Sequence, residues 1–258
     1  MHHDYKPFLN TAVAAAREAS RILLQNVDRI DRLHIRQKDA GELVSNVDEQ
    51  VDGLLIEKIS SAYPEHAILT EESGFHGCAD AEYRWVIDPI DGTTNYIMGI
   101  GQFCISIALL HHNNPVIAVV YQPITDELFT AMINCGSRLN GVRIRSNKPG
   151  QHVTDIAALS PGSRLHAGAI ELPSSLSEHY PNGLRVRIIG SAALSIVYQA
   201  CARFRLFYGA NLKIWDIAAA ALIAQEAGSI VKIKKSASVA NLIDKIAVLH
   251  SQSPNIEL

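Results

Sequence analysis

The chain has 258 residues, of which 48% are hydrophobic and 19% charged, and this composition excludes an intrinsically disordered protein. A formal net charge of −3 gives no electrostatic footprint for nucleic acid, so we expect no nucleic-acid partner. The N-terminus has no apolar secretory core, and the longest apolar run, residues 217–224, is too short to cross a bilayer. We therefore expect a cytoplasmic protein with no membrane partner.

The first part of the chain alternates between helical and extended patterns. Apolar residues recur at helical spacing over residues 8–25 and 46–60, which predicts two amphipathic helices. Between them, alternating polar and apolar residues over 32–38 predict a strand with one solvated face.

The middle of the chain predicts a sheet. Short apolar runs at 67–70 and 83–88 predict buried strands, and the polar stretch 74–82 between them predicts a loop. Residues 103–111 and 116–122, joined by His-Asn-Asn-Pro, predict an antiparallel hairpin. The sequence then predicts a further strand of the same sheet over 127–133 and a turn over 134–141.

A proline-containing stretch over 147–183 has no regular pattern and divides the chain. We therefore predict one compact catalytic domain, residues 1–258, made of two fused halves at roughly 1–148 and 149–258. The second half predicts a strand at 185–189, a helix from Ser191, a short strand at 204–208 and a helix from Asp216 that ends near Gly228. Strands in runs with helices between them predict a mixed α/β layered fold.

Four acidic residues stand at the ends of apolar elements instead of on solvated faces. Glu71 and Asp88 follow predicted strands, Asp91 lies in the next turn, and Asp216 begins a helix. Each has an ordinary explanation alone, since Glu71 with Glu72 reads as a charged loop and Asp216 as an N-cap worth about 1 kcal/mol. Several carboxylates at one sheet edge, however, must either protonate or bind cations. Oxygen ligands without His or Cys favour Mg²⁺, which substrate phosphate can complete.

The segment WVIDPIDGTTNY (85–96) supports this interpretation. An Asp-Gly pair is common in turns, so a tight turn alone explains most of the motif. Such a turn would also direct both of its carboxylates and the carbonyl of Ile90 toward one cluster of ions. Gly92 leaves the backbone bare, so that the amides of residues 92 and 93 can approach a phosphate, and Thr93 adds a hydroxyl.

Taken together, these motifs resemble the inositol monophosphatase family of Mg²⁺-dependent, typically lithium-sensitive phosphomonoesterases. The resemblance rests on TEESG (70–74), WVIDPIDGTTNY (85–96), GSAAL (190–194), WDIAAAALIAQEAG (215–228) and, near the N-terminus, QKDAGELVSNVDEQVD (37–52). It implies a layered αβαβα sandwich of the inositol monophosphatase and fructose-1,6-bisphosphatase type. It also implies a homodimer, two or three Mg²⁺ ions and a small-molecule phosphate monoester as substrate.

The resemblance further implies a role for each matching residue. Glu71, Asp88 and the Ile90 carbonyl would hold one metal ion, a second would lie between Asp88, Asp91 and Asp216, and a third near Glu71. Glu71, Asp88 and Thr93 would be catalytic, with Thr93 and Glu71 orienting the attacking water. The implied phosphate- and substrate-binding residues are Ile90, Asp91, Gly92, Thr93, Gly190, Ser191, Ala192 and Asp216. Lys38, Asp48 and Glu72 would support this network.

The activity implied is that of a phosphoric monoester hydrolase of the inositol-1-monophosphatase type. It would release phosphate from inositol 1-phosphate, or a similar polyol or sugar phosphate, by direct displacement with a metal-activated water. The chain departs from the family at Gly209, where many inositol-hydrolysing members have a Glu that bonds ring hydroxyls. Glu42 and Ser45 also stand where members usually have Asp and Thr. The residues implied to bind the metal ions and the phosphate are therefore present. The residue that would bind the alcohol group of the substrate is not, so the sequence does not specify that alcohol.

Two alternatives remain. The chain could be a non-catalytic or weakly active regulatory or binding protein on the same scaffold, because a fold does not fix a function. It could also be a phosphatase for fructose 1,6-bisphosphate or for a nucleotide, although Thr-Thr-Asn after Asp-Gly is not the pattern of nucleotide-hydrolysing relatives.

Overall fold

The computed structural model of the protein describes residues 4–27, 29, 34–37, 43–146, 156–160, 183–237 and 241–249. Within these residues, no helix is both long and apolar enough to cross a membrane. The helices found there are α1 (Lys6–Asn26), α2 (Asn46–Ala62), α3 (Thr93–Ile97), α5 (Ala192–Ala200) and α6 (Ile214–Glu226).

The largest sheet has eight strands in the order β10-β9-β8-β7-β6-β5-β3-β4. In chain order these are β3 (Ala67–Thr70), β4 (Gly74–His76), β5 (Tyr83–Asp91), β6 (Cys104–His111), β7 (Asn114–Gln122), β8 (Glu127–Met132), β9 (Gly136–Leu139) and β10 (Val142–Arg143). Neighbouring strands are antiparallel, except that β3 and β5 run parallel. Two strand ends from distant points of the sequence therefore meet at one edge of this sheet.

The second sheet has five strands in the order β12-β11-β13-β15-β14. They are β11 (Ile156–Ser160), β12 (Arg185–Arg187), β13 (Leu206–Lys213), β14 (Ile230–Lys235) and β15 (Leu242–Leu249). A small antiparallel pair, β1 (Ile35–Gln37) and β2 (Leu43–Ser45), leads into α2.

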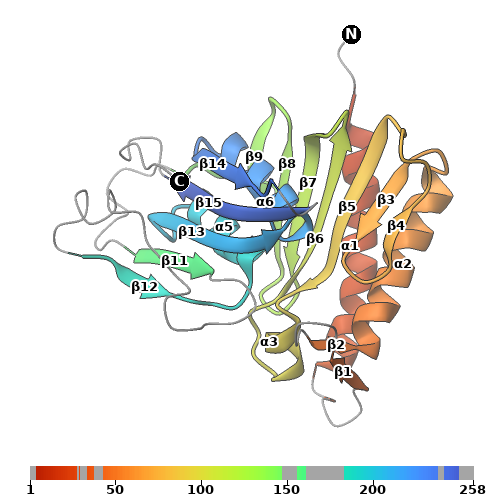
Figure 1. Ribbon diagram of the computed structural model, residues 1–258, viewed down its shortest axis with the longest axis horizontal. Helices are drawn as coiled ribbons and strands as arrows, with labels where there is room; N and C mark the ends of the chain where they lie inside the picture. The colour runs from red at the N-terminus through yellow and green to blue at the C-terminus, as the bar shows by residue number, and fades with distance from the viewer. Residues whose placement is uncertain are drawn as a thin grey trace.

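The sheets and helices form layers (Figure 1). Helices α1 and α2 cover one face of the large sheet, where buried residues such as Ala16, Val51 and Trp85 share one core. Helices α5 and α6 pack between the other face and the five-stranded sheet, in a second core that includes Leu222 and Ile246. The mixed α/β layered fold predicted from the sequence is therefore confirmed. The described residues form four layers, in the order α, β, α, β. The prediction of a fifth, helical layer concerns the part of the chain outside the described residues.

Most predicted elements of the first half are confirmed. The strand at 67–70 is found with the predicted bounds, and the helix predicted at 46–60 runs from Asn46 to Ala62. That helix begins where it does because Ser45 and Asp48 form a capping box at its N-terminus. The predicted hairpin is β6 and β7, which pair antiparallel.

Three predicted loops or turns contain strands. The polar loop 74–82 begins with β4, the turn 134–141 contains β9, and the irregular stretch 147–183 contains β11. These short segments carry Gly, Ser or Arg, and they become strands because a neighbouring strand supplies their hydrogen-bond partners. Strand β14, which is largely exposed, and strand β15 are also not among the elements predicted above.

Candidate active site

Three of the predicted acids meet at the edge where β3 and β5 end. A ligand oxygen of Glu71, one of Asp88 and one of Asp216 all lie within 4.8 Å of one another. Thr70 pairs with Ile87 across β3 and β5, and the Glu71 amide donates to the Ile87 carbonyl at 3.1 Å. This register places Glu71 beside Asp88, so the strand order itself joins two of the three carboxylates.

Asp216 reaches the same place from the next layer. Ser106 on β6 is the partner of Asp88 across the sheet, and its hydroxyl donates to the carbonyl of Trp215 at 3.3 Å. This hydrogen bond holds the N-terminus of α6 opposite Asp88. The helix begins at Ile214, earlier than predicted, so Asp216 is its third residue and not its N-cap. One Asp216 oxygen accepts the Lys213 amide at 2.7 Å.

The carboxylate cluster places a buried acid next to other acids. Asp88 is 1% exposed. Burial, followed by the neighbouring charges of Glu71, Asp91 and Asp216, raises the pKa of the Asp88 carboxyl well above its ordinary range. Three carboxylate oxygens this close together are the kind of donor set that a hard divalent cation prefers.

The segment after Asp88 is a compact irregularity in β5, not a free turn. The regular pairing with β6 shifts between Asp88 and Asp91, and the Ile90 amide donates back to Asp88 at 3.0 Å. Gly92 follows with φ of +100°, and an added Cβ there would lie 2.9 Å from the Gln102 carbonyl oxygen. Only glycine fits this position without strain, because its φ is positive and neighbouring backbone fills the space of a side chain.

Asp91 is held by the N-terminus of α5. Its carboxylate accepts the Ser191 hydroxyl at 2.5 Å, the Ala193 amide at 2.7 Å and the Ala192 amide at 3.3 Å, and the Cys104 thiol lies at 3.7 Å. Burial raises the pKa of Asp91, while these hydrogen bonds lower it. The side chain therefore lies outside the three-carboxylate cluster but close enough to act on the pKa of Asp88.

Thr93 is oriented by two elements. Its hydroxyl lies 3.0 Å from the Ile90 carbonyl and 3.1 Å from an Asp48 oxygen, so the proton of that hydroxyl faces the protein. Asp48 is fully buried, and it also accepts the Ser45 hydroxyl at 2.5 Å. Burial raises the pKa of Asp48, and its bonds to Ser45 and Thr93 oppose this. The lone pairs of Thr93 Oγ1 are left to face a water or a phosphate.

The remaining predicted residues surround this arrangement. Gly190, with φ of +77°, packs against the side chain of Asn95, which donates to the Gln102 and Ile189 carbonyls. Glu72 is half-buried next to Glu71. Lys38 and Glu42 lie outside the described residues.

Sequence reasoning missed four contributors to the site. Ser106 fastens α6, Ser45 and Cys104 contact the buried acids, and the Ala193 amide binds Asp91. Ala193 carried a usable signal, because the second residue of a helix that starts after an N-cap Ser has a free amide. Ser45 carried one as well, because Ser45 and Asp48 have the spacing of a capping box.

Comparison with known proteins identifies the family. A match to the inositol monophosphatase family extends over residues 4–250. The chain belongs to the inositol monophosphatase family. Two relatives named "Nus factor SuhB" are each 37% identical: that of Xylella fastidiosa over 243 residues, covering 93% of this chain and 86% of that protein, and that of Escherichia coli over 225 residues, covering 87% and 84%.

Solved structures of the family share the fold. The extragenic suppressor protein SuhB of Bartonella henselae superposes with a TM-score of 0.82 at 32% identity, covering 95% of this chain and 94% of that chain. The inositol monophosphatase from Anabaena superposes with a TM-score of 0.74 at 28% identity, covering 96% and 93%.

The names of these relatives correct one expectation. A Nus factor acts in transcription, so the prediction of no nucleic-acid partner, made from net charge, is wrong. The physical reason is that net charge averages over the whole surface, whereas a partner contacts one local patch.

Proposed function

We propose that this chain is a Mg²⁺-dependent phosphomonoesterase that acts on inositol 1-phosphate or a similar polyol or sugar phosphate. The observation that carries the proposal is the convergence of Glu71, Asp88 and Asp216 within 4.8 Å, next to the bare backbone of Gly92. A buried acid such as Asp88, whose pKa is raised by burial and by neighbouring acids, is a feature of functional sites, since folding stability alone does not favour it.

The donor set fits the family's metal. Glu71, Asp88 and Asp216 would hold Mg²⁺ ions, with Asp91 and the Ile90 carbonyl completing their surroundings. When bound, such ions offset the charge of a phosphate ester and lower the pKa of a coordinated water. Two or three ions and inhibition by Li⁺ are what the resemblance implies, and both belong to this proposal.

The residues of the chain would bind the phosphate and orient the attacking water. The amides of Gly92 and Thr93 would donate to phosphate oxygens, as the resemblance implies. Thr93 Oγ1, whose proton faces Asp48 or Ile90, would accept a hydrogen bond from the attacking water. Glu71 would accept a second hydrogen bond from that water and place it in line with the phosphorus. Glu71 follows β3 and Thr93 begins α3, directly after β5, so both residues are attached to the paired strands β3 and β5.

The alcohol half of the substrate is less constrained. Gly209 is buried in β13, and an added Cβ there would lie 2.7 Å from Leu212 Cδ1 and 2.9 Å from Phe207 Cζ. No side chain at 209 binds a ring hydroxyl, so the proposal names a class of polyol and sugar phosphates. A phosphate-release screen over inositol, sugar, glycerol and nucleotide monophosphates, with and without Mg²⁺, ranks these substrates.

The proposal is tested by Glu71→Gln. This change keeps the size of the side chain and removes its charge, so turnover with Mg²⁺ should fall at least about a hundredfold, since a metal centre contributes several kcal/mol to the barrier. The matched control is Glu65→Gln, an exposed residue just before β3, which should retain wild-type turnover. Undiminished phosphate release by Glu71→Gln, with a native circular dichroism spectrum, would refute the assignment.

A second candidate is a regulatory or binding protein on the same scaffold, and the relatives named "Nus factor SuhB" favour it directly. It predicts negligible turnover across the whole substrate panel together with a defined macromolecular partner. The two functions separate cleanly, because Glu71→Gln would abolish phosphate release and leave partner binding unchanged.

Assembly and location belong to the proposal as well. We infer a homodimer, which sedimentation of the purified chain tests directly, and a cytoplasmic protein, which fractionation of the source cells tests.

A further inference from the structure

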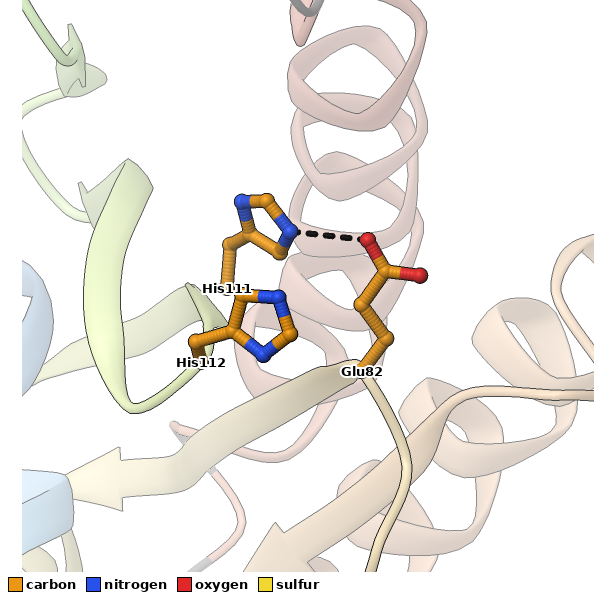
Figure 2. Close-up of side chains that lie close together, drawn as sticks. All are labelled: Glu82, His111 and His112. Atoms are coloured by element: carbon orange, nitrogen blue, oxygen red, sulfur yellow. Dashed lines mark hydrogen bonds and ion pairs between the residues drawn. The ribbon is translucent and has the colours of Figure 1, made fainter.

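A second cluster of ligand side chains lies at the opposite end of β5. Glu82 precedes this strand, His111 ends β6 and His112 follows it in the turn to β7. One ligand atom from each of these three residues lies within 4.8 Å of the other two. Figure 2 shows the two imidazole rings and the Glu82 carboxylate converging. Glu82 and Asp88 are separated by roughly 20 Å of strand, at about 3.3 Å per residue, so this cluster is independent of the carboxylate site.

The backbone brings the cluster together. Tyr83 and His111 are partners across β5 and β6, so Glu82 comes to lie beside the end of β6. The amide of His112 then donates to the Glu82 carbonyl at 3.1 Å, and His112 has a positive φ of 47°. The three side chains therefore project from a backbone that is held by hydrogen bonds.

His111 is held on every side. Its Nε2 lies 2.8 Å from Glu82 Oε1, and its Nδ1 lies 3.0 Å from the Tyr5 hydroxyl at the start of α1. Its ring stacks on Tyr83, with centroids 4.6 Å apart and planes 11° from parallel, and on His112 at 4.4 Å. A ring fixed in this way presents one nitrogen to Glu82 and one to Tyr5.

We propose that Glu82, His111 and His112 form a second metal site, for a borderline divalent ion of which Zn²⁺ fits best. Two imidazoles and one carboxylate are a zinc donor set, and water can fill the remaining positions. Nitrogen donors favour Zn²⁺, whereas the oxygen-only cluster at the far end of β5 favours Mg²⁺. The two sites would therefore select different ions.

The hydrogen bond from His111 to Tyr5 has the form of a supporting contact. A metal-bound histidine typically uses its other ring nitrogen in a hydrogen bond that fixes the ring. The bond between His111 and Glu82 uses one nitrogen of His111, and the stacking of His112 brings a second imidazole to the same place. An ion in place of the proton between Nε2 and Oε1 would contact all three and would tie the start of α1 to the sheet.

The test is a calorimetric titration of the full chain with ZnCl₂ in excess Mg²⁺, which occupies the oxygen-only cluster. We expect one Zn²⁺ per chain, and His112→Ala or Glu82→Gln should weaken Zn²⁺ binding at least about tenfold. Both changes lie at exposed positions, so the variants should fold, and circular dichroism checks this. Phosphate release in Mg²⁺ should not change in either variant.

Two controls make the result specific. His34→Ala removes an exposed histidine elsewhere and should leave Zn²⁺ affinity unchanged. His2 and His3 precede Tyr5 and lie outside the described residues, so the titration is repeated in a His2→Ala/His3→Ala background.

A third variant, Tyr5→Phe, distinguishes a built site from chance contact. It should keep the stoichiometry and weaken binding by about tenfold, because only the orienting hydrogen bond is lost. The proposal is overturned if the wild type binds no Zn²⁺ in excess Mg²⁺, or if His112→Ala and wild type bind it equally.

Discussion

At Asp88 the chain keeps an acid where both burial and three neighbouring acids oppose its ionisation. A buried carboxylate without a cation destabilises the folded state, and the same carboxylate beside a bound cation does not. The residue therefore favours metal binding at the expense of metal-free stability, which leads to a prediction.

Asp88→Asn should make the metal-free protein more stable at neutral pH, by roughly 0.5–2 kcal/mol, the usual range for relief of a destabilised site. Urea denaturation in EDTA measures the change. The exposed Asp80→Asn serves as control and should be neutral. A metal-free Asp88→Asn protein that is less stable than wild type would contradict this account.

Asp88 also predicts the direction in which the stability of the metal-free protein changes with pH. The folded state raises the pKa of Asp88 above its ordinary value of 3.8, so the folded state binds the proton more tightly than the unfolded state. Metal-free wild-type protein should therefore gain stability as the pH falls from neutral toward that ordinary value, and lose it again as the pH rises. This Asp88 contribution should be absent from Asp88→Asn in the same urea series, run from neutral pH downward.

The acids themselves could be predicted from the sequence, and their partners could not. An acid that follows an apolar run, such as Glu71 or Asp88, is visible because it interrupts the pattern. Ser106 and Cys104 lie inside an apolar strand and interrupt nothing, so their contacts with Trp215 and Asp91 follow only from strand pairing and layer packing.

Among the elements, the irregular end of β5 depends on one glycine. Gly92→Ala should destabilise the protein by roughly 1–3 kcal/mol, because residue 92 has φ of +100° and a new Cβ would meet the Gln102 carbonyl. Chemical denaturation measures the loss.

Gly53→Ala is the matched comparison. Gly53 is an exposed position inside α2, with no atom within 4 Å of an added Cβ. The same substitution there should stabilise the protein by about 0.5–1 kcal/mol. Equal effects at the two positions would argue against a strained backbone at Gly92.

Elements with internal periodicity were predictable, and the short strands near the ends of the large sheet were not. Helix α2 and the hairpin of β6 and β7 carry their own pattern and turn. Strands β9 and β4 are short and polar, and they form because a neighbouring strand supplies their hydrogen-bond partners. The strand β13 extends past the predicted 204–208 because β15 pairs with it along its length.

For the whole molecule, the carboxylate cluster joins two layers. Glu71 and Asp88 belong to the large sheet and Asp216 to α6, which packs between the sheets. An ion bound there would stabilise their association. Mg²⁺ at a hundred times its dissociation constant should raise the free energy of unfolding by about 2.7 kcal/mol.

Asp216→Asn should lose most of this Mg²⁺ response while Asp80→Asn keeps it, as measured by urea denaturation at several Mg²⁺ concentrations. An equal response in both variants would show that Mg²⁺ acts elsewhere on the protein.

The layered α/β fold could be predicted from the order of helices and strands. Net charge, in contrast, led to a wrong prediction, that of no nucleic-acid partner, as the names of the relatives show. Composition describes the whole surface, whereas recognition depends on local arrangement.

The position of Asp91 bears on how mutagenesis of this family member is to be interpreted. One carboxylate borders the acidic cluster and also anchors the first turn of α5 through a hydroxyl and two amides. Loss of activity in an Asp91 mutant would therefore not show that Asp91 binds a metal ion. Displacement of α5 and loss of a metal ligand would both give an inactive enzyme. The ligand question is better asked at Glu71.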